Sequence, residues 1–173
     1  MPYCEIVWPV RSVSTWSSVV PSRSSSLPSV AAFAYAAKFG DIAPGRIGNG
    51  TLVYDVPLSG DALAKSALAY ENLVAGGNSA DSPALRVKSS DAPGVLIIRM
   101  PSPYVYLWGD LSADLKVGKG GSIKVSLSRN NGLDWKEVFS TANSGACKID
   151  LKPFVYRLYD YHLKLEFKGA GTG

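Results

Sequence analysis

Apolar and polar residues alternate along much of the chain from residue 84 onward. The alternation is clearest over residues 111–117, 123–128 and 161–167, where every second side chain is apolar. This period of two is typical of strands that bury one face and leave the other in water. Shorter strand candidates, bounded by proline and other turn residues, lie at 51–56, 84–88, 95–100, 104–108 and 135–139. The pattern predicts an all-β fold, an antiparallel two-sheet β-sandwich with jelly-roll-like connectivity.

One segment, near residues 61–69, has a helical pattern instead. Ser59 or Asp61 can cap a helix there, and Leu63 and Ala67 fall on one helical face. The segment is short and rich in alanine, so a helix depends on packing against the rest of the domain. A strand over residues 70–74 fits the sequence equally well.

The first 45 residues differ in composition from the rest. Residues 11–29 contain nine serines and two arginines, and an apolar run follows at 27–37. Within that run, Ala34, Tyr35 and Ala36 match the small-x-small pattern of a signal-peptide cleavage site. We therefore expect a Ser/Arg/Pro-rich leader or disordered tail over residues 1–45, and we favour an exported, extracellular location slightly over other locations.

Residues 46–173 are expected to form the single β-sandwich domain. Apolar residues make up 46% of the chain and charged residues 18%, a composition that excludes a disordered protein. The glycine-rich end at residues 169–173 suggests a sandwich that is truncated at its C-terminus.

Charge, cysteine content and hydropathy narrow the functional classes. The net charge is +4, but lysine and arginine are scattered, so we expect no nucleic-acid partner. Cys4 and Cys147 are too few for a disulfide framework, and no Cys/His cluster points to zinc. No run approaches the roughly 18 apolar residues of a membrane span.

The most specific motif is Ser-Arg-Asn-Asn-Gly-Leu-Asp-Trp at residues 128–135. Its Asn131-Gly132 pair is a strong hairpin signal. The segment resembles the Asp-box (BNR-type) hairpin, Ser-x-Asp-x-Gly-x-x-Trp, of sialidases and other glycan-processing proteins. Asn130 replaces the motif's aspartate, but its side-chain oxygen can still accept backbone N–H groups, and Trp135 is expected to pack over the hairpin. Because Asp-boxes lie away from the active site in that family, the resemblance implies a structural hairpin and not sialidase activity.

Over residues 104–167 the order of segments resembles the second half of a galactose-binding-like, carbohydrate-binding β-sandwich, a type of module associated with glycoside hydrolases. Tyr-Glu-Asn at residues 70–72 is also similar to the opening strand of some such modules, in which an early glutamate and a late aspartate hold a structural calcium. The resemblance therefore implies Glu71 and Asp160 as ligands of a structural Ca²⁺. The alternative is that both are ordinary surface carboxylates.

Aromatic residues are the strongest candidates for ligand contacts, because their rings stack on the apolar faces of sugars. Tyr104, Tyr106 and Trp108 alternate and should share one face of their strand, while Tyr156 and Tyr159 cluster near the chain end. The candidate ligand-binding residues are Tyr104, Tyr106, Trp108 and Tyr159. The alternative is that rings at this spacing belong to the core or to cross-strand pairs.

Catalysis has less support. The only histidine, His162, lies on the polar side of its strand, where a solvent-facing position is the simpler interpretation. No Gly-x-Ser-x-Gly elbow presents a nucleophile to it. The favoured hypothesis is a noncatalytic, glycan-binding-like accessory module of an extracellular or hydrolase-associated protein, with a carbohydrate or other small molecule as partner. The alternatives are a small hydrolase of glycosidic or lactone/ester bonds, with His162 and Asp160 as catalytic candidates and calcium as a possible requirement, and a structural or partner-binding piece of a larger protein.

Overall fold

The computed structural model describes residues 5–11, 32–35, 49–56, 58, 61–76, 84–102 and 104–173, with side chains from residue 51 onward. These residues form strands β1 (Glu5–Arg11), β2 (Ala32–Tyr35), β3 (Asn49–Asp55), β4 (Ala69–Glu71), β5 (Leu73–Ala75), β6 (Leu85–Val87), β7 (Gly94–Pro101), β8 (Val105–Tyr106), β9 (Asp110–Leu115), β10 (Ser122–Ser128), β11 (Lys136–Thr141), β12 (Gly145–Asp150) and β13 (Asp160–Lys168). The helices among them are α1 (Ala62–Ser66) and α2 (Lys152–Val155). The predicted all-β class, with one short helix near residues 61–69, is confirmed.

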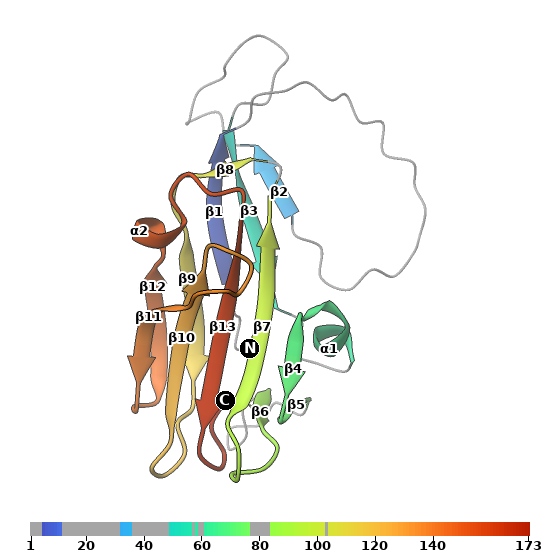
Figure 1. Ribbon diagram of the computed structural model, residues 1–173, viewed down its shortest axis with the longest axis vertical. Helices are drawn as coiled ribbons and strands as arrows, with labels where there is room; N and C mark the ends of the chain where they lie inside the picture. The colour runs from blue at the N-terminus through green and yellow to red at the C-terminus, as the bar shows by residue number, and fades with distance from the viewer. Residues whose placement is uncertain are drawn as a thin grey trace.

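Two main sheets run along the long axis of the molecule (Figure 1). The β9 sheet has the order β12-β9-β1-β3-β2, with β8 paired to β1, and the β13 sheet has the order β11-β10-β13-β7-β4. A separate ribbon joins β5 to β6. Every pairing among the described strands is antiparallel, as the alternating sequence predicts.

The second half of the chain winds between these sheets as a nested ribbon. β10 pairs with β11 in the β13 sheet, β9 pairs with β12 in the β9 sheet, and β7 pairs with β13 back in the β13 sheet. Successive pairs, from the innermost outward, therefore alternate between the two sheets. This is the jelly-roll-like connectivity expected from the sequence.

The core lies between the two sheets. One cluster of buried residues contains Leu111 and Ile149 from the β9 sheet together with Leu96 and Leu163 from the β13 sheet. Burying each such side chain contributes roughly 2 kcal/mol of transfer free energy. The shared cluster explains why alternate residues of both sheets are apolar, and it makes the two sheets a sandwich.

The structure corrects two sequence expectations and resolves one ambiguity. Asp61 occupies the N-cap position of α1, but its side chain makes no capping hydrogen bond. Both alternatives for residues 61–74 occur, because the helix α1 is followed by the strands β4 and β5. The expected strand at residues 104–108 is reduced to β8, two residues long, because only its middle pairs with β1.

No helix in the described part of the chain is long and apolar enough to cross a membrane. Cys147 is half-buried and free, and burial raises the pKa of its thiol. The expected leader at residues 1–45 and Cys4 fall largely or wholly outside the described residues.

The glycine-rich C-terminal segment is packed closely against the domain. Thr172 is fully buried, and its hydroxyl oxygen accepts the Gly118 N–H at 3.0 Å. Its carbonyl oxygen accepts the Val87 N–H at 3.0 Å, so the segment bridges the β9–β10 turn and β6. A methyl group on Gly118 would collide with the carbonyl oxygen of Ala170. Glycine at position 118 is therefore required by close approach.

Thr172→Val tests this contact, because valine has the same shape but no hydroxyl. The Gly118 N–H would lose its partner, and the free energy of unfolding should fall by about 1–3 kcal/mol. Chemical denaturation measures this difference. Thr141→Val, at a partly exposed threonine that bonds only within its own turn, is the control and should cost clearly less. Equal losses in both variants would contradict the proposed importance of the Thr172 contact.

Candidate functional site

The loop between α2 and β13, residues 156–159, is fixed to the end of the sandwich by backbone hydrogen bonds. The Tyr106 N–H donates to the Leu158 carbonyl and the Arg157 N–H to the Tyr106 carbonyl, each at 2.8 Å. The Ser102 N–H donates to the Tyr159 carbonyl at 2.8 Å. These bonds hold the 156–159 loop against β8 and the end of β7, so its side chains project from a fixed backbone.

Local sequence explains how the chain reaches this loop. The Asp150 carboxylate accepts the Lys152 N–H at 2.8 Å, and Pro153 lies in the first turn of α2. Proline there needs no intrahelical partner and fixes a helical φ. The helix ends after Val155, and Arg157 then takes a φ of 66°. This left-handed conformation is uncommon for a residue other than glycine or asparagine.

Two tyrosines of the 156–159 loop are exposed to solvent. Tyr156 is 46% exposed and Tyr159 is 58% exposed. The guanidinium carbon of Arg157 lies 5.3 Å from the centroid of the Tyr156 ring, a cation–π geometry. The loop therefore presents two aromatic rings and one cation at the surface.

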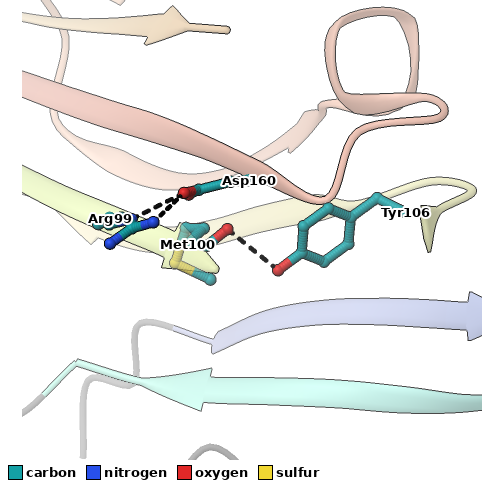
Figure 2. A network of polar contacts seen from close by, with 4 residues as sticks. All are labelled: Arg99, Met100, Tyr106 and Asp160. Atoms are coloured by element: carbon teal, nitrogen blue, oxygen red, sulfur yellow. Dashed lines mark hydrogen bonds and ion pairs between the residues drawn. The ribbon is translucent and has the colours of Figure 1, made fainter. Parts of the chain in front are cut away.

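Tyr106, a predicted ligand-binding residue, is instead a core residue. Its ring is fully buried and meets Tyr161 edge-on, with 5.3 Å between ring centroids. Its hydroxyl donates to the Met100 carbonyl at 3.3 Å, as Figure 2 shows. Burial raises the pKa of the Tyr106 phenol. For Tyr106 the alternative interpretation therefore holds, in which a ring at this spacing belongs to the core.

The other three aromatic candidates flank the same end of the sandwich. Tyr104 directly precedes β8, and Trp108 lies two residues after it. Both are half-buried, and Tyr104 packs against the core. Tyr159 belongs to the loop that hydrogen-bonds to this region. The structure thus brings Tyr104, Trp108 and Tyr159 to one end. Sequence reasoning missed Arg157, and its position between two tyrosines was the only available signal.

Asp160 is engaged in an ion pair with Arg99. Its Oδ2 accepts Nε of Arg99 at 2.7 Å and Nη2 at 2.5 Å (Figure 2). This hydrogen bonding, together with the charge of Asp160, raises the pKa of the Arg99 guanidinium. The carboxylate of Asp160 is therefore already paired with a cationic side chain of the same protein, Arg99.

The two proposed calcium ligands, Glu71 and Asp160, lie far apart along β7. Glu71 is exposed and lies opposite Val95 of β7, whereas Asp160 lies opposite Pro101 of the same strand. Six residues along a strand correspond to roughly 20 Å, so Glu71 and Asp160 cannot share one ion. Among the described residues, no group of three or more His, Cys, Asp or Glu side chains could hold a metal.

The β10–β11 connection, residues 129–135, contains a tight two-residue turn at Asn131 and Gly132. Asn131 and Gly132 have φ of 57° and 88°, and the Leu133 N–H donates to the Asn130 carbonyl at 3.3 Å. Positive φ at both central residues is the geometry of a type I′ turn, for which Asn-Gly is the preferred sequence. The predicted hairpin at Asn131-Gly132 is confirmed.

The side chains of Ser128 and Asn130 form hydrogen bonds within the hairpin. The Ser128 hydroxyl accepts the Gly132 N–H at 2.8 Å and donates to the Asn130 side-chain oxygen at 2.9 Å. The same oxygen of Asn130 accepts the Asp134 N–H at 2.9 Å. Asparagine thus performs the backbone-accepting role expected of it at this position.

The hairpin folds back over the outer face of β13. Trp135 is half-buried, and the Lys164 ammonium lies 4.8 Å from the centroid of its ring. A methyl group on Gly132 would lie 3.9 Å from Nδ1 of His162. His162 is only 8% exposed as a result. The expectation of a solvent-facing histidine is therefore wrong, because the hairpin covers the polar face of its strand.

Lys164 contacts both the hairpin and a neighbouring charged residue, Glu166, on the same face of the sheet. Its ammonium lies 3.5 Å from Oε2 of Glu166, which Lys124 also approaches to 3.1 Å. Burial alone would raise the pKa of Glu166, but the two lysines together outweigh burial and lower it. On the outer face of the β13 sheet, Glu166 is thus paired with both lysines.

Comparison with protein-family models and with curated proteins finds no match to this chain. The functional argument therefore depends on the site itself.

Ser128→Ala tests the hairpin network. The Ser128 side chain is almost completely buried, and its removal leaves the Gly132 N–H without its acceptor. The free energy of unfolding should fall by about 1–3 kcal/mol in a denaturant titration. Ser126→Ala is the matched control, since Ser126 lies on the same face of β10, is buried to a similar degree and takes no part in the hairpin's hydrogen bonds. If the two variants are equally stable, the hairpin network does not stabilise the domain.

Proposed function

We propose that this chain is a noncatalytic glycan-binding module, accessory to an extracellular or hydrolase-associated protein. The observation that carries the proposal is the exposure of Tyr156 and Tyr159 on a loop fixed by three backbone hydrogen bonds. Tyrosine rings stack on the apolar C–H faces of sugars and use their hydroxyl groups for polar contacts. The 156–159 loop is the proposed glycan platform.

Rigidity makes this loop a better platform than an equally aromatic but unfixed segment. Ordering a loop on binding opposes association, and preorganisation removes that opposition. Here the backbone of residues 157–159 is already bonded to Tyr106 of β8 and to Ser102, the residue after β7. Tyr104 and Trp108, half-buried at the same end, supply further aromatic surface next to the loop.

The Asp-box resemblance supports the same class of protein. The side chains of Ser128 and Asn130 accept backbone N–H groups of the type I′ turn. These bonds agree with the structural role that the resemblance implies for residues 128–135. The resemblance is to sialidases and other glycan-processing proteins, although the hairpin itself is not their binding site. The resemblance therefore strengthens the proposal without locating the ligand.

The hydrolase alternative has less support from the same geometry. A general base must come within hydrogen-bonding reach of the proton that it removes. His162 lies beneath the hairpin and Asp160 is paired with Arg99, so neither group is freely presented to a substrate. A binding function uses the exposed rings of Tyr156 and Tyr159. A hydrolytic function would need His162 or Asp160, which are covered or paired.

Tyr159→Ala tests the platform. An array of neutral and acidic glycans identifies ligands of the wild type, and calorimetry then compares affinities. Losing one stacked ring should weaken binding by about 0.5–1.5 kcal/mol, or roughly 2- to 12-fold, with little change in stability because the ring is exposed.

Leu68→Ala is the control for this experiment. Leu68 is 56% exposed, close to the 58% of Tyr159, but lies beside β4 and away from the loop. Its removal should leave glycan affinity unchanged, while Tyr159→Phe should retain most of it. Wild-type protein that binds no glycan, or Tyr159→Ala protein that binds as tightly as the wild type, would contradict the proposal.

A further inference from the structure

We infer that the 156–159 loop selects saccharides carrying an anionic group, a carboxylate or a sulfate, and that Arg157 recognises this group. The inference rests on the proposed glycan-binding function and names its ligand class. It follows from the position, the charge and the backbone conformation of Arg157.

Arg157 carries a charge that is not neutralised within the described part of the chain. The ion pairs found there involve Arg99, Lys124, Lys148 and Lys164, and none includes Arg157. The adjacent acid, Asp160, is already bonded to Arg99. A guanidinium group presents paired N–H donors that match the two oxygens of a carboxylate or sulfate. Arg157 can therefore accept an external anion without breaking an internal ion pair.

The backbone holds Arg157 in a conformation that arginine does not favour. Its φ of 66° lies in the left-handed region, which is unfavourable for a residue other than glycine. The hydrogen bond from its N–H to the Tyr106 carbonyl maintains this conformation. Glycine or asparagine would satisfy the turn with less strain, so the turn does not explain an arginine. Such strain is concentrated at functional sites, and anion recognition gives it a reason here.

Tyr156 and Tyr159 have different roles in this arrangement. The guanidinium carbon of Arg157 lies 5.3 Å from the centroid of the Tyr156 ring, and this contact orients the guanidinium group. Tyr159, the more exposed of the two, offers its ring to the sugar. Lys136, whose ammonium lies 5.1 Å from the Phe154 ring of α2, adds positive charge next to the loop. A sugar stacked on Tyr159 with its anionic group toward Arg157 uses all of these groups.

The test uses three saccharide probes of similar length: a neutral oligosaccharide, an oligouronate and a sulfated oligosaccharide. The wild type should bind at least one anionic probe on the order of tenfold more tightly than the neutral probe. Arg157→Asn should remove this preference by lowering the affinity for the anionic probe to about that for the neutral probe. Asparagine tolerates the left-handed conformation, so the variant is expected to fold. Arg157→Lys should retain only part of the preference, because lysine lacks the planar fork.

Lys119→Asn is the charge control. It removes one positive charge from the exposed β9–β10 turn, at the opposite end of β9 from the loop, and should leave the preference intact. Polyglutamate, an anion without a sugar ring, should bind much more weakly than the anionic saccharide.

The outcomes separate this inference from the proposed function. Equal affinity for neutral and anionic probes would overturn anion selection but not glycan binding. Loss of preference in Lys119→Asn as in Arg157→Asn, or tight binding of polyglutamate, would also overturn it, since net charge would then explain the attraction. Absence of binding to all three saccharides would overturn both. The ratio of affinities for the two anionic probes identifies carboxylate or sulfate as the recognised group.

Discussion

The pairing of β13 along both of its edges is the constraint on which the rest of the structure depends. β13 bonds to β7 on one side and to β10 on the other, and its register fixes which side chains face the core. Tyr161 and Leu163 point inward, while His162 and Lys164 face the hairpin on the opposite side. A slip of one residue would exchange these two sets. The core, the covered polar face and the start of the 156–159 loop are therefore fixed together.

The candidate site is a consequence of how β13 begins. The strand starts at Asp160, directly after a loop whose backbone bonds to β7 and β8. Because these bonds use backbone groups, Tyr156, Arg157 and Tyr159 can project into solvent, while Leu158 packs against the core. This separation between a fixed backbone and free side chains is typical of binding loops on rigid sandwiches.

The features that could be predicted from sequence are those with local physical causes. Alternation over residues 161–167 fixed the strand, and Asn131-Gly132 fixed the hairpin, because both signals depend on neighbouring residues alone. The burial of Tyr106 and the covering of His162 depend on contacts with distant strands. The separation of Glu71 from Asp160 likewise needs the strand register, which the chain itself does not display.

The central claim is that glycans bind at the 156–159 loop, and NMR titration tests it most directly. A saccharide added to isotopically labelled protein should shift the amide and aromatic signals of residues 156–159, with smaller shifts at Tyr104 and Trp108. The signals of His162, the only histidine in the chain, should stay unchanged because the hairpin covers it. Shifts centred on His162 and the outer face of β13, with the loop unaffected, would contradict the account.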